Sequence, residues 1–267
     1  MIRVILFFLL LNSCATENLE TRYRLIKEID KKSQFKEIIY KDNLNIFSLQ
    51  KLKKNISVII YIEGDGLSWI DRFTPSSDPT PINPIGFKLA SLSDSSVDVV
   101  YLARPCQYVK TEACNREIWT KLQYSEQILN TYENILKELS YKYSDIHLVG
   151  YSGGAVIAMY LGSLKDNNIK SIRTIAGNID PNEFTRLLNL TPFKTTVDLS
   201  NLNQNIKAVS QTHYYGIYDK VIPEELYKNY KKKILDNSCV KISAIKASHN
   251  EGWEEFWKYN SKITLNC

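Results

Sequence analysis

Residues 148–154 read Leu-Val-Gly-Tyr-Ser-Gly-Gly and contain the clearest candidate for a nucleophile, Ser152. The segment matches the pattern G-x-S-x-G and lies between an apolar stretch typical of a strand and one typical of a helix. A strand-to-helix turn this tight needs glycines around the serine, because side chains there would collide. We therefore expect the Ser152 hydroxyl at the carboxyl edge of a sheet and at a helix N-terminus, where it can attack a carbonyl carbon.

A serine hydroxyl attacks well only when a base removes its proton, and the chain offers three histidines. His147 and His213 both lie inside predicted strands, which favours a structural role for each. His249 instead follows the last predicted strand directly, so it should face the same sheet edge as Ser152. We predict that His249 is the general base.

The base needs a carboxylate to fix its tautomer and to stabilise the imidazolium. Asp219 follows the predicted strand 209–216, and the resulting order Ser, Asp, His along the chain is a known order for a catalytic triad. Asp180 also follows a predicted strand, so it is the alternative acid. Because Pro181 comes next, Asp180 also suits the N-cap of a helix. We favour Asp219.

A tetrahedral oxyanion needs at least two hydrogen-bond donors. The backbone N–H of Gly153, directly after the nucleophile, is the first candidate. The second should come from the loop after the third strand, which reads Glu-Gly-Asp-Gly over residues 63–66. We assign the N–H of Asp65 to this oxyanion hole, with Gly64 as the alternative.

The hydrophobic pattern predicts the elements that position these residues. An antiparallel pair, 35–40 and 44–49, is followed by strands alternating with helices, which indicates an α/β fold: a mostly parallel central sheet with helices on both faces. The predicted strands are 56–62, 97–102, 145–150, 169–176, 209–216 and 240–246. The predicted helices are 84–92, 118–141, 153–164, 223–233 and 251–259. Residues 180–206 fit this pattern poorly, and we expect them to form a small cap over the site.

Length and composition narrow the classes of protein. A chain of 267 residues suits one large α/β domain, and its 44% hydrophobic and 24% charged residues are typical of a globular protein with a full core. The net charge of +5 comes from scattered lysines without an arginine-rich stripe, so we expect no nucleic-acid partner. No cysteine pair has the spacing of a metal site, so we expect neither a metal nor a cofactor. We expect a monomer that acts on a small acyl substrate.

The N-terminus has the layout of a secretory signal: Arg3, an apolar run over residues 4–11 and small residues before Cys14. Residues 11–14, Leu-Asn-Ser-Cys, resemble a bacterial lipobox, in which the cysteine carries the lipid. This resemblance implies a lipoprotein signal peptide over 1–13 and a lipid anchor at Cys14; an ordinary cleaved signal is the alternative. We expect a partly helical tether over 14–33 and a catalytic domain over 34–267.

Besides Cys14, the chain has four cysteines, an even number that suits disulfides in an exported protein. Cys106 and Cys114 are close in sequence and flank one loop, so we expect them to pair. Cys239 opens the last predicted strand, and the final helix should bring Cys267 back to the same sheet edge. A second disulfide, between Cys239 and Cys267, is therefore expected.

Four segments resemble a group of bacterial α/β-hydrolases that have no assigned substrate and of which many carry lipoprotein signals: 61–66, 78–81, 103–108 and 149–154. The wider resemblance to the α/β-hydrolase superfamily covers residues 35–262. It implies the α/β-hydrolase fold and a Ser-Asp-His triad, but no particular substrate. Arg104 and Gln107 follow a strand, where they either line the site or pair with the loop of Cys106.

Together these observations predict an exported, lipid-anchored protein of the bacterial cell envelope that cleaves an ester or related acyl bond through an acyl-serine intermediate. Carboxylesterase is the central expectation; thioesterase, acyltransferase and peptidase are neighbouring chemistries that the fold does not separate. The alternative is a non-catalytic, envelope-anchored binding lipoprotein that keeps the hydrolase fold.

Overall fold

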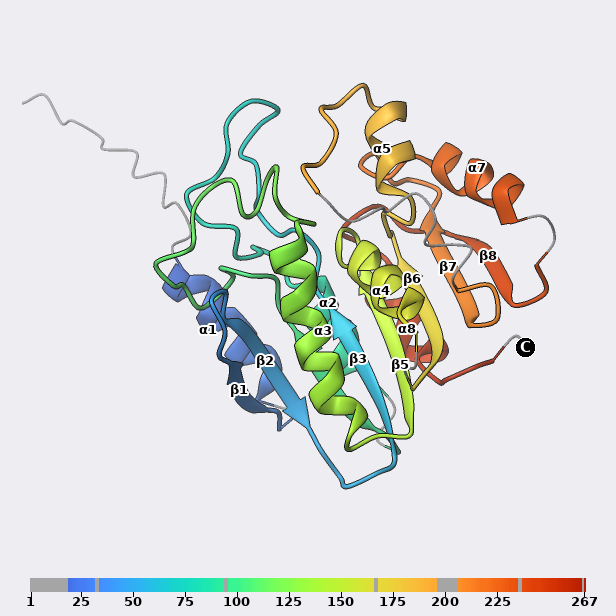
Figure 1. The fold of residues 1–267 in the computed structure, drawn as a ribbon, viewed down its shortest axis with the longest axis horizontal. Helices are drawn as coiled ribbons and strands as arrows, with labels where there is room; N and C mark the ends of the chain where they lie inside the picture. The colour runs from blue at the N-terminus through green and yellow to red at the C-terminus, as the bar shows by residue number, and fades with distance from the viewer. Residues whose placement is uncertain are drawn as a thin grey trace, which may run out of the picture.

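The computed structural model describes residues 19–31, 34–93, 96–165, 168–195, 206–234, 237–265 and 267. An eight-stranded sheet in the order β1-β2-β4-β3-β5-β6-β7-β8 forms its centre (Figure 1). β2 runs antiparallel to both of its neighbours, and the pairs from β4 to β8 are parallel. The strands are β1 (Lys36–Tyr40), β2 (Ile46–Lys51), β3 (Ser57–Ile62), β4 (Asp98–Leu102), β5 (Asp145–Tyr151), β6 (Ile169–Ile175), β7 (Ser210–Gly216) and β8 (Val240–Ile245).

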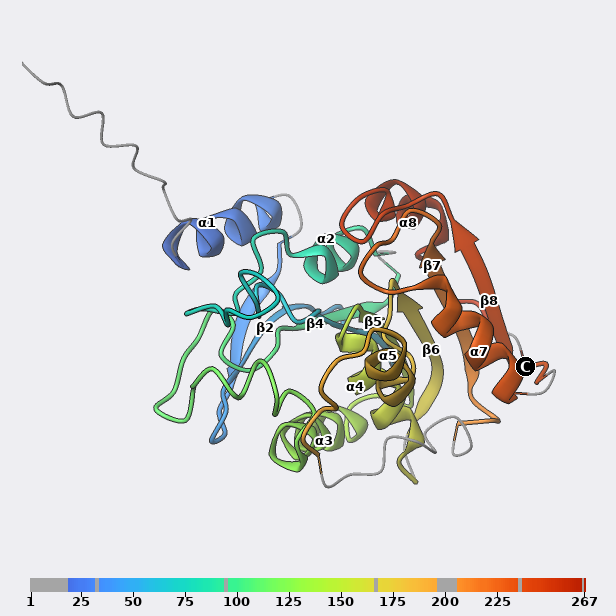
Figure 2. The same cartoon turned by 90° about the horizontal axis from the view of Figure 1, so that it is seen from above.

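Helices cover both faces of this sheet, as Figure 2 shows from above. On one face α1 (Leu19–Asp30), α2 (Ile85–Ser91) and α8 (Trp253–Asn260) enclose one apolar core. On the other, α3 (Glu126–Ser140), α4 (Gly154–Ser163) and α7 (Glu224–Ile234) enclose a second core, and the short α5 (Pro181–Leu187) packs beside α7. β3, β4 and β5 are buried almost throughout, as expected for parallel strands covered on both faces.

The predicted fold class is confirmed, and each predicted strand and helix is present within a few residues, with one larger error. The helix predicted over 118–141 begins only at Glu126, with Ser125 as its N-cap residue. Residues before it form successive turns instead, and within them the backbone carbonyl of Gln123 accepts a hydrogen bond from the Arg104 guanidinium (2.7 Å). In a helix that carbonyl would accept the N–H of residue 127.

The segment expected to be a tether belongs partly to the folded domain. Residues 19–30 form α1, whose Ile26 is fully buried. Arg22 of the same helix donates to the carbonyl of Thr80 (2.7 Å) and so fastens α1 to a loop of the domain. The helical part of the predicted tether therefore packs against the domain. The predicted signal peptide and Cys14 lie outside the described residues.

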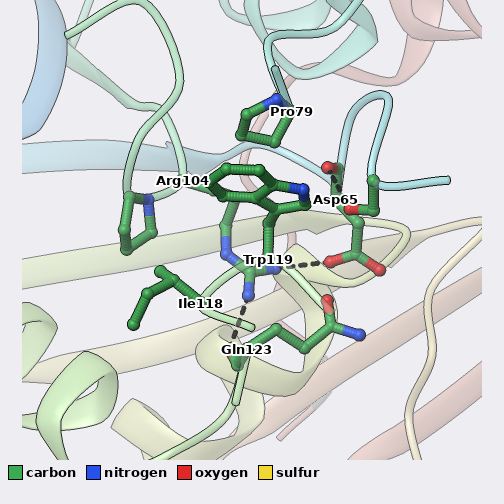
Figure 3. Close-up of a pocket in the computed structure, with 8 residues that line it drawn as sticks. Asp65, Pro79, Arg104, Ile118, Trp119 and Gln123 are labelled. Carbon is green, nitrogen blue, oxygen red and sulfur yellow. Dashed lines mark hydrogen bonds and ion pairs between the residues drawn. The ribbon is translucent and has the colours of Figure 1, made fainter. Parts of the chain in front are cut away.

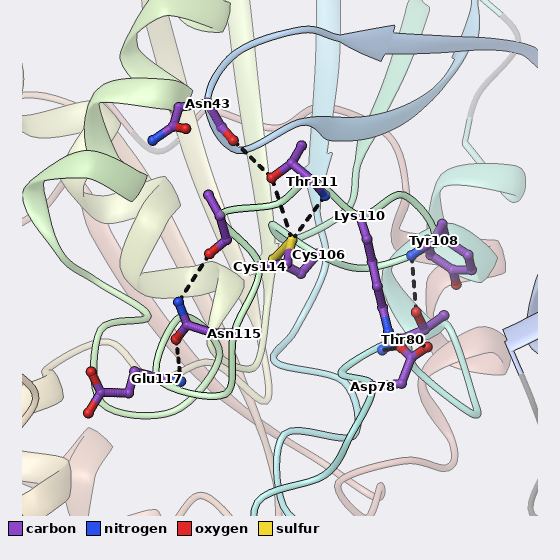
Figure 4. The surroundings of a disulfide bond; sticks show 11 residues. Asn43, Asp78, Thr80, Cys106, Tyr108, Lys110, Thr111, Cys114, Asn115 and Glu117 are labelled. Carbon is purple, nitrogen blue, oxygen red and sulfur yellow. Dashed lines mark hydrogen bonds and ion pairs between the residues drawn. A yellow bond between two sulfur atoms is a disulfide. The ribbon is translucent and has the colours of Figure 1, made fainter.

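Both expected disulfides are present, Cys106–Cys114 and Cys239–Cys267. The first closes the loop after β4 (Figure 4). Such bonds persist in oxidising compartments, so they favour an exported location. In the part of the chain that the structure describes, no helix is long and apolar enough to cross a bilayer.

Candidate active site

Ser152 stands on a sharp turn between β5 and α4, with a positive φ of 49°. The turn needs its glycines. A Cβ on Gly150 would lie 2.6 Å from Cα of Ala155, and one on Gly154 would lie 2.4 Å from the carbonyl oxygen of Ile62. The backbone N–H of Ser152 donates to the carbonyl of Ile175, which ties the turn to β6 (3.0 Å). The serine is therefore held rigidly at the carboxyl edge of the sheet.

The structure brings Ser152, His249 and Asp219 together in one chain of hydrogen bonds. Ser152 Oγ lies 3.0 Å from His249 Nε2, and His249 Nδ1 lies 2.9 Å from Asp219 Oδ2. Because a carboxylate only accepts, Nδ1 carries the proton and Nε2 is left to accept from the serine hydroxyl. The Asp219 side chain is only 1% exposed, so this contact is shielded from water.

Two aromatic side chains fix the loop that carries His249. The Tyr151 hydroxyl donates to the carbonyl of His249 (2.9 Å), and its ring lies 5.5 Å from the imidazole centre. The indole N–H of Trp253 donates to the same carbonyl (3.1 Å). Neither residue was singled out from the sequence. Tyr151 occupies a variable position of the serine motif, so no pattern pointed to it.

The Asp219 carboxylate is anchored from its other side. Its Oδ1 accepts the backbone N–H groups of Val221 (2.7 Å) and Ile222 (3.0 Å). Asp180, the alternative acid, is not part of this chain of hydrogen bonds. Its Oδ1 caps α5 by accepting the N–H of Glu183 (3.0 Å), the N-cap role that the sequence suggested for it.

The loop 63–66 lies beside the nucleophile, and a Cβ on Gly64 would be 3.1 Å from Ser152 Cβ. The N–H of Gly64 already donates to the Glu63 side chain (3.0 Å). The N–H groups of Asp65 and Gly153, in contrast, have no hydrogen-bond partner among the described residues. These two groups are thus available to an oxyanion, which favours Asp65 over Gly64.

Glu63 holds this loop in place through hydrogen bonds of its side chain. Its fully buried carboxyl accepts the N–H groups of Gly64, Gly86 and Phe87 and the hydroxyl of Tyr101. Burial raises the pKa of Glu63, although these four donors oppose the shift. The carboxyl therefore joins the loop to the first turn of α2.

Two residues after β4, Arg104 and Gln107, also hold the loop 63–66 in place. The Gln107 amide donates to the carbonyls of Gly64 (3.0 Å) and Pro79 (3.3 Å), and its oxygen accepts the N–H of Arg104 (3.0 Å). The Arg104 guanidinium pairs with the Asp65 carboxylate at 2.7 Å (Figure 3). Of the two roles left open from the sequence, pairing within the loop of Cys106 is seen in the contact between Arg104 and Gln107, and neither residue is among those that line the cavity around Ser152.

An open cavity of about 580 Å³ surrounds Ser152 and His249. Asp65, Gln123 and Asn250 are among the polar residues that line it, and Trp69 is among the apolar ones. Among the described residues, neither Lys nor Arg lines it. The described part of the expected cap contributes none of its lining; residues 196–205 of that cap lie outside the described residues.

The other two histidines are structural, as predicted. His147 Nδ1 lies 2.8 Å from Ser171 Oγ, and His213 Nδ1 lies 2.9 Å from Thr174 Oγ1. Burial lowers the pKa of His147 to about 4 and that of His213 to about 3. Both are therefore neutral at physiological pH.

The sheet order, the strand-turn-helix around Ser152 and the helices on both faces define the class: the chain has the α/β-hydrolase fold. Solved structures agree with this assignment. A carboxylesterase from Bacillus subtilis is similar with a TM-score of 0.59 and 8% identity, covering 91% of this chain and 96% of that one. An esterase from Pyrococcus furiosus is similar with a TM-score of 0.57 and 16% identity, covering 88% and 90%.

An alpha-beta serine hydrolase homologue from Coxiella burnetii is also similar, with a TM-score of 0.56 and 16% identity over 84% of this chain and 96% of that one. No protein-family model and no curated protein matches the chain. At such low identities the solved structures establish the fold, and the chemistry has to be argued from the site itself.

Proposed function

We propose that the protein is a serine hydrolase that cleaves an ester or related acyl bond through an acyl-serine intermediate. One observation carries the proposal: Ser152 Oγ is 3.0 Å from His249 Nε2, and His249 Nδ1 is 2.9 Å from the buried Asp219 carboxylate. The similarity of the fold to esterases supports the same reaction class.

In the proposed reaction, Ser152 Oγ attacks the carbonyl carbon while His249 Nε2 takes the hydroxyl proton. The carbonyl oxygen becomes an oxyanion and accepts the free N–H groups of Gly153 and Asp65. His249 then returns its proton to the departing alcohol, which leaves an acyl-serine. Water, deprotonated by the same histidine, releases the acid and restores Ser152. Asp219 stabilises the imidazolium in both halves.

Labelling with a fluorophosphonate probe tests the nucleophile, because the serine oxygen replaces fluoride on phosphorus only when its proton is removed. We expect one label on the folded protein and none on Ser152→Ala, whose turnover should fall by about 10⁴- to 10⁶-fold. Ser163→Ala, a change outside the site, is the matched control and should label fully. A wild-type protein that folds but does not label would support the binding-lipoprotein alternative instead.

The acyl preference follows from the cavity walls. A panel of nitrophenyl esters of graded chain length would define it, and the cavity of about 580 Å³ suits a small acyl group with its leaving group. Because Trp69 and Ile82 line the cavity, we expect uncharged acyl chains to be accepted. A protein that labels but hydrolyses none of the esters would point to a thioesterase, acyltransferase or peptidase.

We further propose that Cys14 is lipidated and anchors the protein in the bacterial cell envelope, on the support of the lipobox-like residues 11–14 and the two disulfides. Cys14→Ser should yield a protein that is recovered without detergent or stays unprocessed. Mass spectrometry of the mature N-terminus is the direct test. A mature terminus other than a lipidated Cys14 would contradict the anchor.

A further inference from the structure

A carboxylate lies against the expected oxyanion hole. A Cβ built on Gly153 would be 2.0 Å from Asp65 Oδ1, so the acid packs directly over the residue that follows the nucleophile. Asp65 also lines the cavity that contains Ser152. An oxyanion forming there would meet a negative charge at short range, where Coulomb energies are large in a partly buried site.

Arg104 is the group that opposes this charge. Its guanidinium lies 2.7 Å from Asp65 Oδ1, and it is the only residue that forms an ion pair with Asp65 in the described ranges. Its side chain is 5% exposed and also donates to the carbonyl of Gln123 (2.7 Å). The guanidinium lies over the ring of Tyr124, with 5.3 Å to the centroid. Arg104 is therefore held in place before any substrate arrives.

Figure 3 shows the Asp65 carboxylate facing the Arg104 guanidinium, with the Gln123 side chain nearby, in the small cavity that Trp119 also lines. With its amide nitrogen facing the acid, Gln123 donates to Asp65 Oδ1 at 2.8 Å and to Oδ2 at 3.2 Å. The Asp65 carboxylate thus has two fixed donors, of which only the guanidinium carries a charge. Burial raises the pKa of Asp65 and Arg104 opposes that rise, so removing the guanidinium would leave the acid beside Gly153 without its compensating charge.

We propose that Arg104 is a positioning residue of the hydrolase: it neutralises the Asp65 carboxylate beside the oxyanion hole and fixes the backbone N–H of Asp65 towards the reacting carbonyl. This inference rests on the proposed function. The ion pair then stabilises the transition state electrostatically, in addition to holding the loop together. Substrate binding itself involves no developing charge, so the effect should fall on kcat and leave KM nearly unchanged.

A double-mutant cycle separates charge from structure. Arg104→Gln should lower kcat on a nitrophenyl ester by about 10- to 100-fold, comparable to or below the loss of one oxyanion donor. Asp65→Asn together with Arg104→Gln removes both charges and should recover at least about tenfold of that kcat, because the repulsion is gone. If Arg104 only braced the loop, the double variant would be as slow as Arg104→Gln or slower.

Two further variants serve as controls. Arg116→Gln alters an exposed arginine of the same loop and should keep the wild-type kcat. Arg104→Lys retains the charge, so it should keep more activity than Arg104→Gln even if the latter folds poorly, as judged by circular dichroism melts. Equal loss in the lysine and glutamine variants would overturn the proposal.

Inhibition by phenylboronic acid gives a second readout. Its boron accepts Ser152 Oγ, the serine proton passes to His249, and the boron becomes a tetrahedral anion that resembles the oxyanion. Its affinity should fall in Arg104→Gln by about the same factor as kcat and return in the double variant. An active wild type with unchanged boronate affinity in Arg104→Gln would refute this inference alone. An inactive, unlabelled wild type would refute the proposed function.

Discussion

Asp180 Oδ2 lies 2.6 Å from the ammonium of Lys233, an ion pair that joins the start of α5 to the end of α7. The other oxygen of Asp180 caps α5. Both oxygens are therefore engaged away from His249, whose Nδ1 contacts Asp219 instead. The two acids that the sequence left as alternatives have distinct surroundings, and this yields a clear prediction.

Asp219→Asn should lower kcat/KM by about 10⁴-fold, because an amide favours the wrong tautomer of His249. Asp180→Asn should keep nearly wild-type kcat/KM and lose about 1 kcal/mol or less of unfolding free energy, since its asparagine still caps α5 and the lost ion pair is partly exposed. Ester hydrolysis and urea unfolding of both variants measure these effects. The opposite pattern would make Asp180 the acid.

The fold could be predicted because each strand and helix has a pattern of apolar residues that is visible within its own short stretch of sequence. Strands such as 57–62 and 98–102 are buried on both faces, so their sequences are apolar after the first residue and easily distinguished from amphipathic helices. The start of α3 could not be predicted. The turns before it include a contact between Arg104 and the carbonyl of Gln123, residues 19 apart in sequence, which no local pattern shows.

The residues of the candidate site differ in how far the sequence predicts them. Ser152, His249 and Asp219 each follow a strand, and strand ends in a parallel sheet meet at one edge, so their proximity follows from topology. Gln123 has no such signal, because it lies in irregular turns and reaches the site only through the tertiary packing of the loop. The pairing of Asp65 with Arg104 likewise requires the geometry of two loops.

The buried histidines should make the protein sensitive to mild acid. The folded pKa values of His147 (about 4) and His213 (about 3) lie below the ordinary value of 6.5. Between these values the unfolded chain binds more protons than the folded one, so stability is full above pH 6.5 and falls as pH decreases. At pH 5 each histidine should cost about 1 to 2 kcal/mol of unfolding free energy relative to pH 7.5.

Urea unfolding at pH 7.5 and pH 5, compared between variants, tests this. Burial raises the pKa of Glu63, so above the ordinary pKa of a glutamate this group makes stability fall as pH rises, the opposite of the histidine effect. The difference between each variant and wild type is therefore more informative than the wild-type stability alone. His147→Gln and His213→Gln should each show a smaller stability loss between the two pH values than wild type, whatever their stability at pH 7.5. An unchanged loss in both would exclude the histidines as its cause.

Removing either disulfide should lower the stability of the protein, but only one of the two removals should also lower its activity. In the chain-entropy picture, closing a loop of 8 residues stabilises by about 2.5 kcal/mol and closing one of 28 residues by about 3.5 kcal/mol. Cys239–Cys267 pins the chain end to the start of β8, at the amino edge of the sheet and away from Ser152. Replacing this pair with serines should lower the melting temperature but leave kcat/KM nearly unchanged.

Cys106–Cys114 has a different position, which Figure 4 shows beside Thr111. Cys106 lies between Arg104 and Gln107, the residues that hold Asp65 and Gly64 in place. Replacing this pair with serines should therefore lower kcat by several-fold as well as the melting temperature, although the loop it closes is the shorter one. The Cys239–Cys267 variant is the matched control, measured well below both melting temperatures. If the two double-serine variants lost activity equally, the loop of Cys106 would have no special link to the oxyanion hole.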